Sequence, residues 1–245
     1  MTNFDSHKTN PVSEVQELNR QYENTDVETI LSRNWEQYGK EMVIGTGFGA
    51  SGAVLMHKLY HLELPVTVFY LDTNLLFRQT YELRDDYAEK YKINFERVET
   101  DLSVDKQAEK YGEKLWNKSP DQCCHIRKVL PLKHYLTDKQ VWVTGVRRDQ
   151  SASRKNTAVF EWDKQNEVIK INPLASWDAD DIWSYIKFYD LPYNPLHDHG
   201  YPSIGCQPCT KPTTDSDNER SGRWSGQEKT ECGIHLVTQE SSEGS

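Results

Sequence analysis

Short apolar runs alternate along the chain with longer stretches of helical spacing. The short runs predict buried strands, and the stretches that repeat an apolar residue every three or four positions predict amphipathic helices. We expect a first strand beginning at Met42, further strands over 66–72, 93–98 and 141–145, and helices over 53–61, 77–91 and 178–189, with a charged helix after the third strand.

This alternation is typical of an α/β fold with a mainly parallel, twisted sheet and helices on both faces. Two further runs, 159–162 and 168–171, are separated by a polar turn and predict a hairpin at the edge of the sheet. We divide the chain, as one domain overall, into an N-terminal segment of two short helices (1–38), an α/β core (39–205) and a C-terminal segment (206–245) that ends in a mobile tail.

The charge pattern narrows the possible ligands. A formal net charge of −9 over 245 residues argues against a protein that mainly binds nucleic acid. The stretch 127–155 nevertheless carries eight Lys or Arg against two Asp, which suits a small anionic ligand as well as it suits a solvated helix face. No run of eighteen apolar residues and no secretory signal pattern is present, so we expect no membrane span and a cytoplasmic protein.

The first candidate site is a glycine-rich turn, Gly45-Thr-Gly-Phe-Gly-Ala-Ser-Gly, between a strand and a helix. Glycines let the backbone approach an anion, and the first N–H groups of the helix bind it. The turn matches neither the Walker pattern nor a clean G-x-G-x-x-G motif. A tight structural turn without a ligand stays open as the alternative.

The second candidate site is a set of four cysteines, Cys123-Cys124 and Cys206-Gln-Pro-Cys209. Four thiolates suit a structural zinc or a [4Fe–4S] cluster. The adjacent pair fits a tetrahedral ion poorly, whereas a cluster can bind neighbouring thiolates on different irons, so geometry favours the cluster. Unrelated buried thiols and a thioredoxin-like dithiol at Cys206 and Cys209 are the alternatives.

The fifth cysteine, Cys232, stands alone in the polar segment Glu231-Cys-Gly-Ile-His235. Nearby basic residues can lower its pKa, and an exposed thiolate is a nucleophile or a redox centre. An incidental tail cysteine is the alternative. Arginines of the loop 145–154, together with Arg220 and Arg223, suit phosphate or sulfate oxygens. His197 and His199 lack a third ligand at a useful spacing, and we interpret them as loop residues.

Three segments then carry a specific resemblance to a known family. They are Cys123-Cys-His-Ile-Arg-Lys-Val, Tyr201-Pro-Ser-Ile-Gly-Cys-Gln-Pro-Cys-Thr and Gly222-Arg-Trp-Ser-Gly-Gln-Glu-Lys-Thr-Glu-Cys-Gly-Ile-His. In this order they resemble the adenylylsulfate/phosphoadenylylsulfate reductase family, and most closely its assimilatory adenylylsulfate branch. The resemblance covers roughly residues 40 to 236 and implies an adenine-nucleotide α-hydrolase-like sheet, with 39–205 as the nucleotide-binding core and the glycine turn as a modified pyrophosphate loop.

The resemblance also implies roles for individual residues. Cys232 attacks the sulfate sulfur of adenosine 5′-phosphosulfate, expels AMP and carries an S-sulfo group until thioredoxin or a glutaredoxin-like dithiol releases sulfite. Cys123, Cys124, Cys206 and Cys209 bind a [4Fe–4S] cluster, with Lys128 between cluster and substrate. The implied substrate contacts are Gly47, Phe48, Gly49, Ala50, Ser51, Leu71, Asp72, Thr73, Lys128, Gly145, Arg147, Arg154, Arg220, Arg223 and His235.

The chain departs from the family pattern at the glycine turn and after the second strand. Gly47 stands where the family has serine, Ser51-Gly52 where it has two acids, and Asn74 where it has glycine, which bears on tolerance of a 3′-phosphate. The same chemistry on the 3′-phosphorylated nucleotide, an ATP-using ligase or sulfurtransferase, and a non-catalytic iron–sulfur sensor remain as alternatives. A homo-oligomer also stays open.

Overall fold

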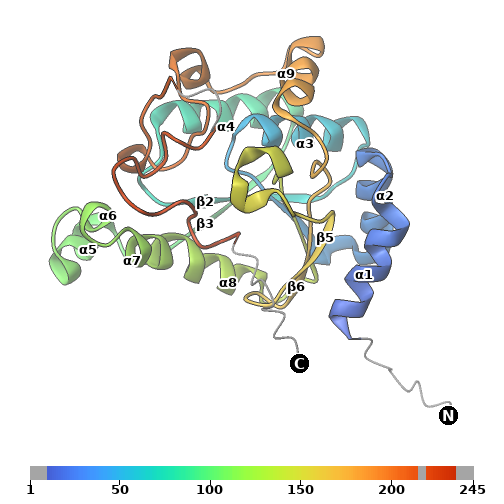
Figure 1. The fold of residues 1–245 in the computed structure, drawn as a ribbon, viewed down its shortest axis with the longest axis horizontal. Helices are drawn as coiled ribbons and strands as arrows, with labels where there is room; N and C mark the ends of the chain where they lie inside the picture. Colours follow the sequence, from blue (N-terminus) through green and yellow to red (C-terminus); the bar gives the residue numbers. More distant parts are fainter. Residues whose placement is uncertain (1–9, 215–218, 236–245) are drawn as a thin grey trace.

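The computed structural model describes residues 10–214 and 219–235. Six strands form one sheet in the order β3-β2-β1-β4-β6-β5, and every pair is parallel except β5 with β6 (Figure 1). The strands are β1 Met42–Gly45, β2 Thr67–Asp72, β3 Phe95–Glu99, β4 Val141–Val143, β5 Phe160–Asp163 and β6 Val168–Ile171. The predicted α/β class, the parallel sheet and the antiparallel hairpin at its edge are confirmed.

Helices cover both faces of the sheet, as expected. They are α1 Pro11–Tyr22, α2 Val27–Tyr38, α3 Ala50–His61, α4 Arg78–Tyr91, α5 Val104–Tyr111, α6 Leu115–Lys118, α7 Pro120–Cys124, α8 Leu130–Leu136 and α9 Ala179–Phe188. Polar N-caps start several of them: the Asp26 carboxylate accepts from Thr29 N–H, and that of Asp178 accepts from Asp181 N–H. Such caps satisfy backbone donors that have no partner within the helix.

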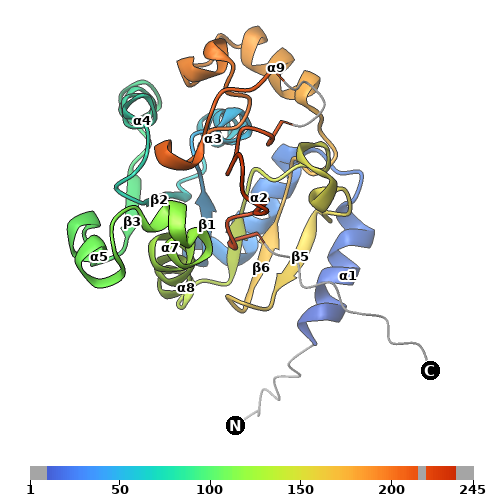
Figure 2. The same cartoon turned by 60° about the vertical axis from the view of Figure 1, so that its left-hand side comes forward.

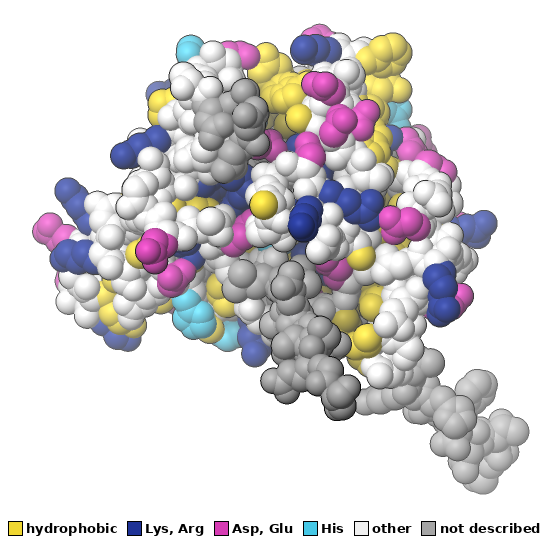
Figure 3. Space-filling model, viewed as in Figure 1, with side chains coloured by type: hydrophobic (Ala, Val, Ile, Leu, Met, Phe, Trp, Pro, Cys, Tyr) yellow, Lys and Arg dark blue, Asp and Glu magenta, His cyan; other side chains and the backbone are white. Residues whose placement is uncertain are grey.

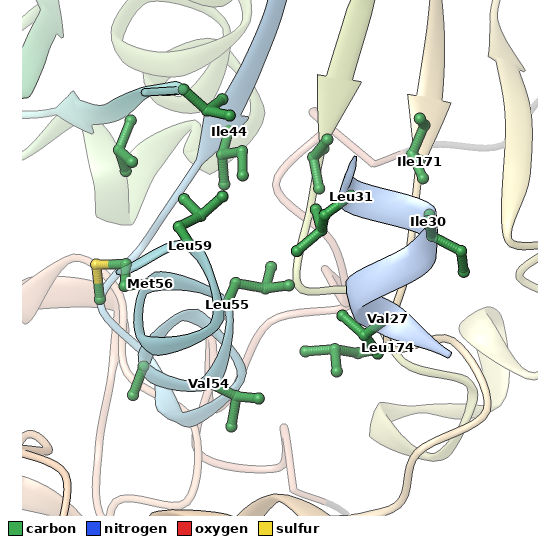
Figure 4. Close-up of a cluster of buried hydrophobic side chains, with 14 of the residues drawn as sticks. Val27, Ile30, Leu31, Ile44, Val54, Leu55, Met56, Leu59, Ile171 and Leu174 are labelled. Carbon is green, nitrogen blue, oxygen red and sulfur yellow. The ribbon is translucent and has the colours of Figure 1, made fainter. Parts of the chain in front are cut away.

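Alternate residues of the central strands point to opposite faces, and each face has its own apolar cluster. Val43, Phe69 and Trp142 pack with Leu132 and Leu136 of α8. The neighbouring strand residues belong to a larger cluster with α2, α3 and α9, part of which Figure 4 shows around Leu55 and Leu31. Because strands with two covered faces lose all contact with water, they read as continuous apolar runs in the sequence.

The N-terminal helices complete the larger cluster and protect the edge of the sheet. The Asn19 side chain of α1 accepts from Phe160 N–H at 2.9 Å and donates to Phe160 O at 2.8 Å. This amide satisfies edge-strand groups that otherwise attract another chain. The parts of the predicted segments at 1–9, 215–218 and 236–245 lie outside the described residues.

Residues 115–136 form helices that the apolar pattern does not predict. A π-helical turn, His125–Val129, joins α7 to α8, and Leu130 N–H donates to His125 O, five residues back. Pro131 explains the turn, because it has no N–H for the carbonyl of Arg127 and its ring crowds that position. A second difference is at α3, which begins at Ala50 and not at 53. The sequence does not predict this first turn because it contains the weak helix formers Ser51 and Gly52.

Within the described residues, no helix combines the length and the apolar character that crossing a membrane requires.

Leu55 provides a test of the core. Its side chain is 1% exposed, whereas that of Leu130 is 38% exposed. We expect Leu55→Ala to lower the free energy of unfolding by about 2–5 kcal/mol, since it removes buried contacts and leaves a cavity. The matched surface change Leu130→Ala should cost far less. Urea denaturation measures both, and equal losses contradict this account of the core.

Candidate active site

A cavity of about 240 Å³ lies where β1, β2 and β4 end. Ligand sites of open parallel sheets form at these carboxyl ends. The cavity is lined by the glycine turn 45–52, by residues that follow β2 and β4, by 202–205 and by residues of 219–235. Lys and Arg side chains gather near the centre of the face shown in Figure 3. Figure 2 shows the end of the described chain, in red, lying against the core.

The glycine turn forms a cradle of backbone at the start of α3. Gly49 is the N-cap of that helix, and Phe48 adopts a left-handed φ of 56°. The hydroxyl of Thr46 stabilises the turn by accepting from Phe48 N–H at 3.0 Å. Gly145 closes the other side, where an added Cβ would lie 3.0 Å from the Cβ of Ser51. The N–H groups of the first turn of α3 therefore face a cavity that suits an anion.

Arg147 is buried beside this turn. Its guanidinium donates to Ser51 Oγ at 2.7 Å, to Asp149 at 2.9 Å and to Glu219 at 3.0 Å. Glu219 has a raised pKa because burial outweighs its pairing with Arg147. Arg147 is thus held in a network that links α3 to the segment 219–235.

Three other arginines line the cavity, and two of them converge on one carboxylate. Arg154 donates to both oxygens of Glu231, at 2.8 and 2.9 Å, and Arg220 donates to the same carboxylate at 3.1 Å. Arg223 lies with its guanidinium carbon 4.6 Å from the ring centroid of Trp224. The site therefore holds several fixed cations, as recognition of a phosphate or sulfate group requires.

Cys232 is buried beside these cations, with 8% of its surface exposed. The expectation of an exposed thiol is wrong, because the chain around Cys232 packs with Cys124, Trp224 and Ile234. Burial by itself raises a thiol pKa. Here the charge of Lys128, the Ile234 N–H and Arg223 outweigh burial and lower the pKa of Cys232. The thiol is therefore a stronger acid than an ordinary cysteine, which favours the nucleophilic thiolate.

Lys128 lines this cavity and a second, smaller cavity next to it. Burial disfavours its charge, but the sulfur atoms of Cys206, Cys232 and Cys124 outweigh burial and raise the pKa of Lys128. The Lys128 ammonium is therefore charged at neutral pH.

The smaller cavity is lined by all four of Cys123, Cys124, Cys206 and Cys209. None of them is in a disulfide. Thr73 Oγ1 lies 3.3 Å from Cys206 Sγ. Burial raises the pKa of Cys124 to about 12 and that of Cys209 to about 11, so without a metal these thiols stay protonated at neutral pH.

The chemistry of the four cysteines suits a polynuclear iron–sulfur group. Among residues 10–214 and 219–235, no group of three or more His, Cys, Asp or Glu side chains is close enough to hold a single metal ion. A cluster binds each thiolate on a different iron, so its ligands stand further apart. An all-sulfur donor set around one cavity fits such a cluster.

Most of the predicted substrate contacts converge on the larger cavity. Its lining includes Gly47, Phe48, Gly49, Ala50, Ser51, Leu71, Lys128, Gly145, Arg147, Arg154, Arg220, Arg223, Cys232 and His235. His235 stacks on Trp142, with centroids 5.2 Å apart, and burial lowers its pKa, so its imidazole is neutral at pH 7.

Asp72 and Thr73 are the two predicted contacts that do not line this cavity. The Asp72 carboxylate accepts from Tyr81 and Arg97, each at 2.7 Å, and Thr73 lines the cysteine cavity instead. Three further residues belong to the site although the sequence does not predict them. Glu219 and His197 line the larger cavity, and the Glu231 carboxylate pairs with Arg154 and Arg220. No local pattern indicates these positions, since their partners are far away in the sequence.

Comparison with known proteins agrees with this geometry. A family model described as the phosphoadenosine phosphosulfate reductase domain matches residues 41–212. The chain is 51% identical over 219 residues to adenosine 5′-phosphosulfate reductase of Salinibacter ruber, an alignment that covers 89% of this chain and 87% of that protein. The chain belongs to the phosphoadenosine phosphosulfate reductase family.

Solved structures confirm the adenine-nucleotide α-hydrolase-like fold of this family member. Phosphoadenylyl-sulfate reductase from Candida auris, in a phosphate complex, superposes with a TM-score of 0.71 at 28% identity and covers 80% of this chain and 96% of its own. FMN adenylyltransferase of Candida glabrata shares the fold, with a TM-score of 0.57 at 14% identity over 94% of this chain and 78% of its own.

The electrostatics of Cys232 can be tested by its reactivity. We expect alkylation of Cys232 by iodoacetamide to reach half its maximal rate below the ordinary thiol pKa of about 8.5. Lys128→Met should shift this midpoint to higher pH, because removing a positive charge destabilises the thiolate. Lys128→Arg keeps the charge and should stay near the wild type. Peptide mass spectrometry isolates the Cys232 rate, and an unshifted Lys128→Met profile contradicts the interpretation.

Proposed function

We propose that this chain reduces adenosine 5′-phosphosulfate to sulfite and AMP in sulfate assimilation, with Cys232 as the nucleophile. The observation that carries the proposal is a buried thiol of lowered pKa in the same cavity as a helix-start anion cradle and several fixed cations. The relatives named for this activity support the substrate. A thiolate and an anionic ligand repel each other unless cations such as these lie between them.

In the proposed reaction the Cys232 thiolate attacks the sulfur of the sulfate group. A sulfur–sulfur bond forms, the bond between that sulfur and the bridging oxygen breaks, and AMP leaves with the electron pair. One thiolate of an external dithiol then attacks the Cys232 sulfur and expels sulfite, which leaves a mixed disulfide with Cys232. The second thiol of the donor attacks its own partner sulfur in this mixed disulfide, so that the donor becomes an internal disulfide and the Cys232 thiol is restored. Thioredoxin or a glutaredoxin-like protein supplies this dithiol in our proposal.

Different residues around the cavity suit the phosphate and the sulfate of the proposed substrate. The turn 45–52 and Arg147 suit the phosphate, and Arg154, Arg220 and Arg223 suit the sulfate end, next to Cys232. AMP leaves as an anion, and cations near its phosphate stabilise the charge that develops there. Arg147 therefore lowers the barrier to cleavage of the sulfur–oxygen bond. Arg147 stays oriented throughout because Ser51 and Asp149 hold it.

A [4Fe–4S] cluster is the proposed cofactor, bound by Cys123, Cys124, Cys206 and Cys209. When bound, it supplies a charged, redox-capable inorganic centre in the cavity next to the substrate. Lys128 lines both cavities, so in our proposal its positive charge acts on the substrate and on the cluster. We propose that the protein works in the cytoplasm, where five cysteines remain reduced.

The 3′-phosphorylated nucleotide is the second candidate substrate. The Candida auris protein is named for it, but the higher identity of the Salinibacter ruber relative favours the unphosphorylated nucleotide. Sulfite release with each nucleotide and a dithiol donor tests the choice. A higher kcat/KM with the 3′-phosphorylated form contradicts our preference.

Replacing the nucleophile provides the sharpest test of the mechanism. Wild-type protein given substrate without reductant should gain one SO₃ group, about 80 Da, on the peptide that contains Cys232, because a thiolate nucleophile forms a covalent adduct. Cys232→Ser should retain nucleotide binding and lose almost all turnover. Mass spectrometry and a sulfite assay measure both effects. An adduct on another cysteine, or steady turnover by the serine variant, refutes the role of Cys232.

The cofactor has its own test. Protein purified without oxygen should contain about four irons and absorb broadly near 400 nm, as thiolate-bound iron–sulfur centres do. Cys209→Ser should lose iron and colour, since it removes a ligand, whereas Cys232→Ser is the matched control that keeps both. Iron analysis and the visible spectrum decide. Colourless protein with one zinc per chain, or loss of iron in Cys232→Ser, overturns the assignment of the five cysteines.

A further inference from the structure

The carboxylate of Glu231 lies where the anion of a ligand is expected. Its side chain is 8% exposed. Arg154 binds both of its oxygens in a fork, at 2.8 and 2.9 Å, and Arg220 adds a third contact at 3.1 Å. A planar guanidinium and two acceptor oxygens make the same paired contact with a carboxylate, a phosphate or a sulfate.

Glu231 is held as an anion in this position. Burial opposes its charge, but the hydrogen bonds from Arg154 and the charges of Arg154, Arg220 and Arg223 lower the pKa of Glu231. Two anions cannot share one pair of guanidinium groups at hydrogen-bond distance without strong repulsion. A ligand whose terminal anion uses Arg154 and Arg220 must therefore exchange with this carboxylate.

We propose that Glu231 is an internal stand-in for the substrate's sulfate group, which neutralises Arg154 and Arg220 in the free protein and is displaced when the nucleotide binds. The inference rests on the proposed function for the identity of the ligand. It adds that the protein itself provides a competitor for its own substrate.

The exchange also acts on the nucleophile, because Glu231 is the neighbour of Cys232 in the chain. Arg220 binds the Thr230 carbonyl at 3.1 Å as well as the Glu231 carboxylate. The ion pair of Lys229 with Asp121 and the stacking of His235 on Trp142 hold the two ends of the same segment. Displacement of Glu231 therefore removes the attachment of its side chain and leaves the two ends of the segment 229–235 in place.

A scaffold role gives the opposite expectation. If Glu231 stays bound and keeps the two arginines in position for the substrate, then neutralising it must weaken ligand binding. If Glu231 is a competitor, then neutralising it must strengthen binding, because the arginines are freed at lower cost. The sign of one change in affinity separates the two roles.

The test is Glu231→Gln, which keeps the shape of the side chain and removes its charge. ADP is the probe, since it places two anionic groups in a row on adenosine and carries no sulfate for Cys232 to attack. We expect ADP to bind at least about tenfold more tightly to Glu231→Gln in calorimetric titration, the size of one weakened charge-assisted contact. Adenosine, which has no anion, should bind both proteins equally.

Glu161→Gln is the matched control, because the Glu161 carboxylate is also buried (12% exposed) and paired with a cation, Lys170, but neither residue lines the cavity. Its effect on ADP binding should be much smaller. A tenfold gain in this variant too, or an equal gain for adenosine, means a general effect of charge and overturns the inference. Unchanged or weaker ADP binding by Glu231→Gln overturns it as well.

Arg154→Ala separates this inference from the function on which it rests. The variant should bind ADP about 10- to 150-fold more weakly than the wild type, and the gain from Glu231→Gln should shrink in the double variant, since one arginine is no longer there to be freed. If Arg154→Ala binds ADP normally, the proposed anion site itself is wrong. If it weakens binding while Glu231→Gln gives no gain, the site stands and only the stand-in role fails.

Discussion

Compensation of buried positive charge is the constraint on which the C-terminal half of the molecule depends. Lys128, Arg154, Arg220 and Arg223 line a single cavity, and an unpaired ion in such a place costs several kcal/mol. Each of them therefore needs an anion or an oriented dipole nearby. The free protein supplies carboxylates and thiols of its own, and the proposed reaction supplies a phosphosulfate.

This need accounts for the way in which the segment 219–235 lies against the core. The segment contributes few apolar side chains, so burial of Trp224 and Ile234 stabilises its contact with the core only weakly. Its acidic groups provide a stronger reason, because Glu219 pairs with Arg147 and Glu231 with Arg154. In a partly buried site such pairs are favourable mainly because breaking them leaves a buried charge without a partner. The position of Cys232 is thus a consequence of the charges beside it.

The sequence predicts the elements whose pattern is local and misses the contacts that span the chain. Buried strands such as β1 and β2 are short apolar runs, and α9 has apolar residues at helical spacing. Strands and helices of these two kinds are therefore predicted from the sequence. The helices from 115 to 136 are not predicted from the sequence, because Pro131 interrupts the helical spacing of apolar residues and a π-helical turn shifts it. The pairing of Arg154 with Glu231 joins residues 77 positions apart, and neither residue type indicates a partner. The spacing of the cysteines separates a set of four from Cys232, but only the packing shows that Cys232 is buried.

Lys128 connects the chemistry of the two cavities. Lys128 lines both cavities, and the negative charge of a Cys232 thiolate is one of the influences that raise its pKa. In the proposed reaction a thiolate becomes an S-sulfo group, and each carries one negative charge. A negative charge therefore stays close to Lys128 throughout the attack. At Arg154 and Arg220, in contrast, the sulfate group of the substrate replaces the Glu231 carboxylate. The lysine keeps a constant partner, and the arginines are the part of the site that responds to whether substrate is bound.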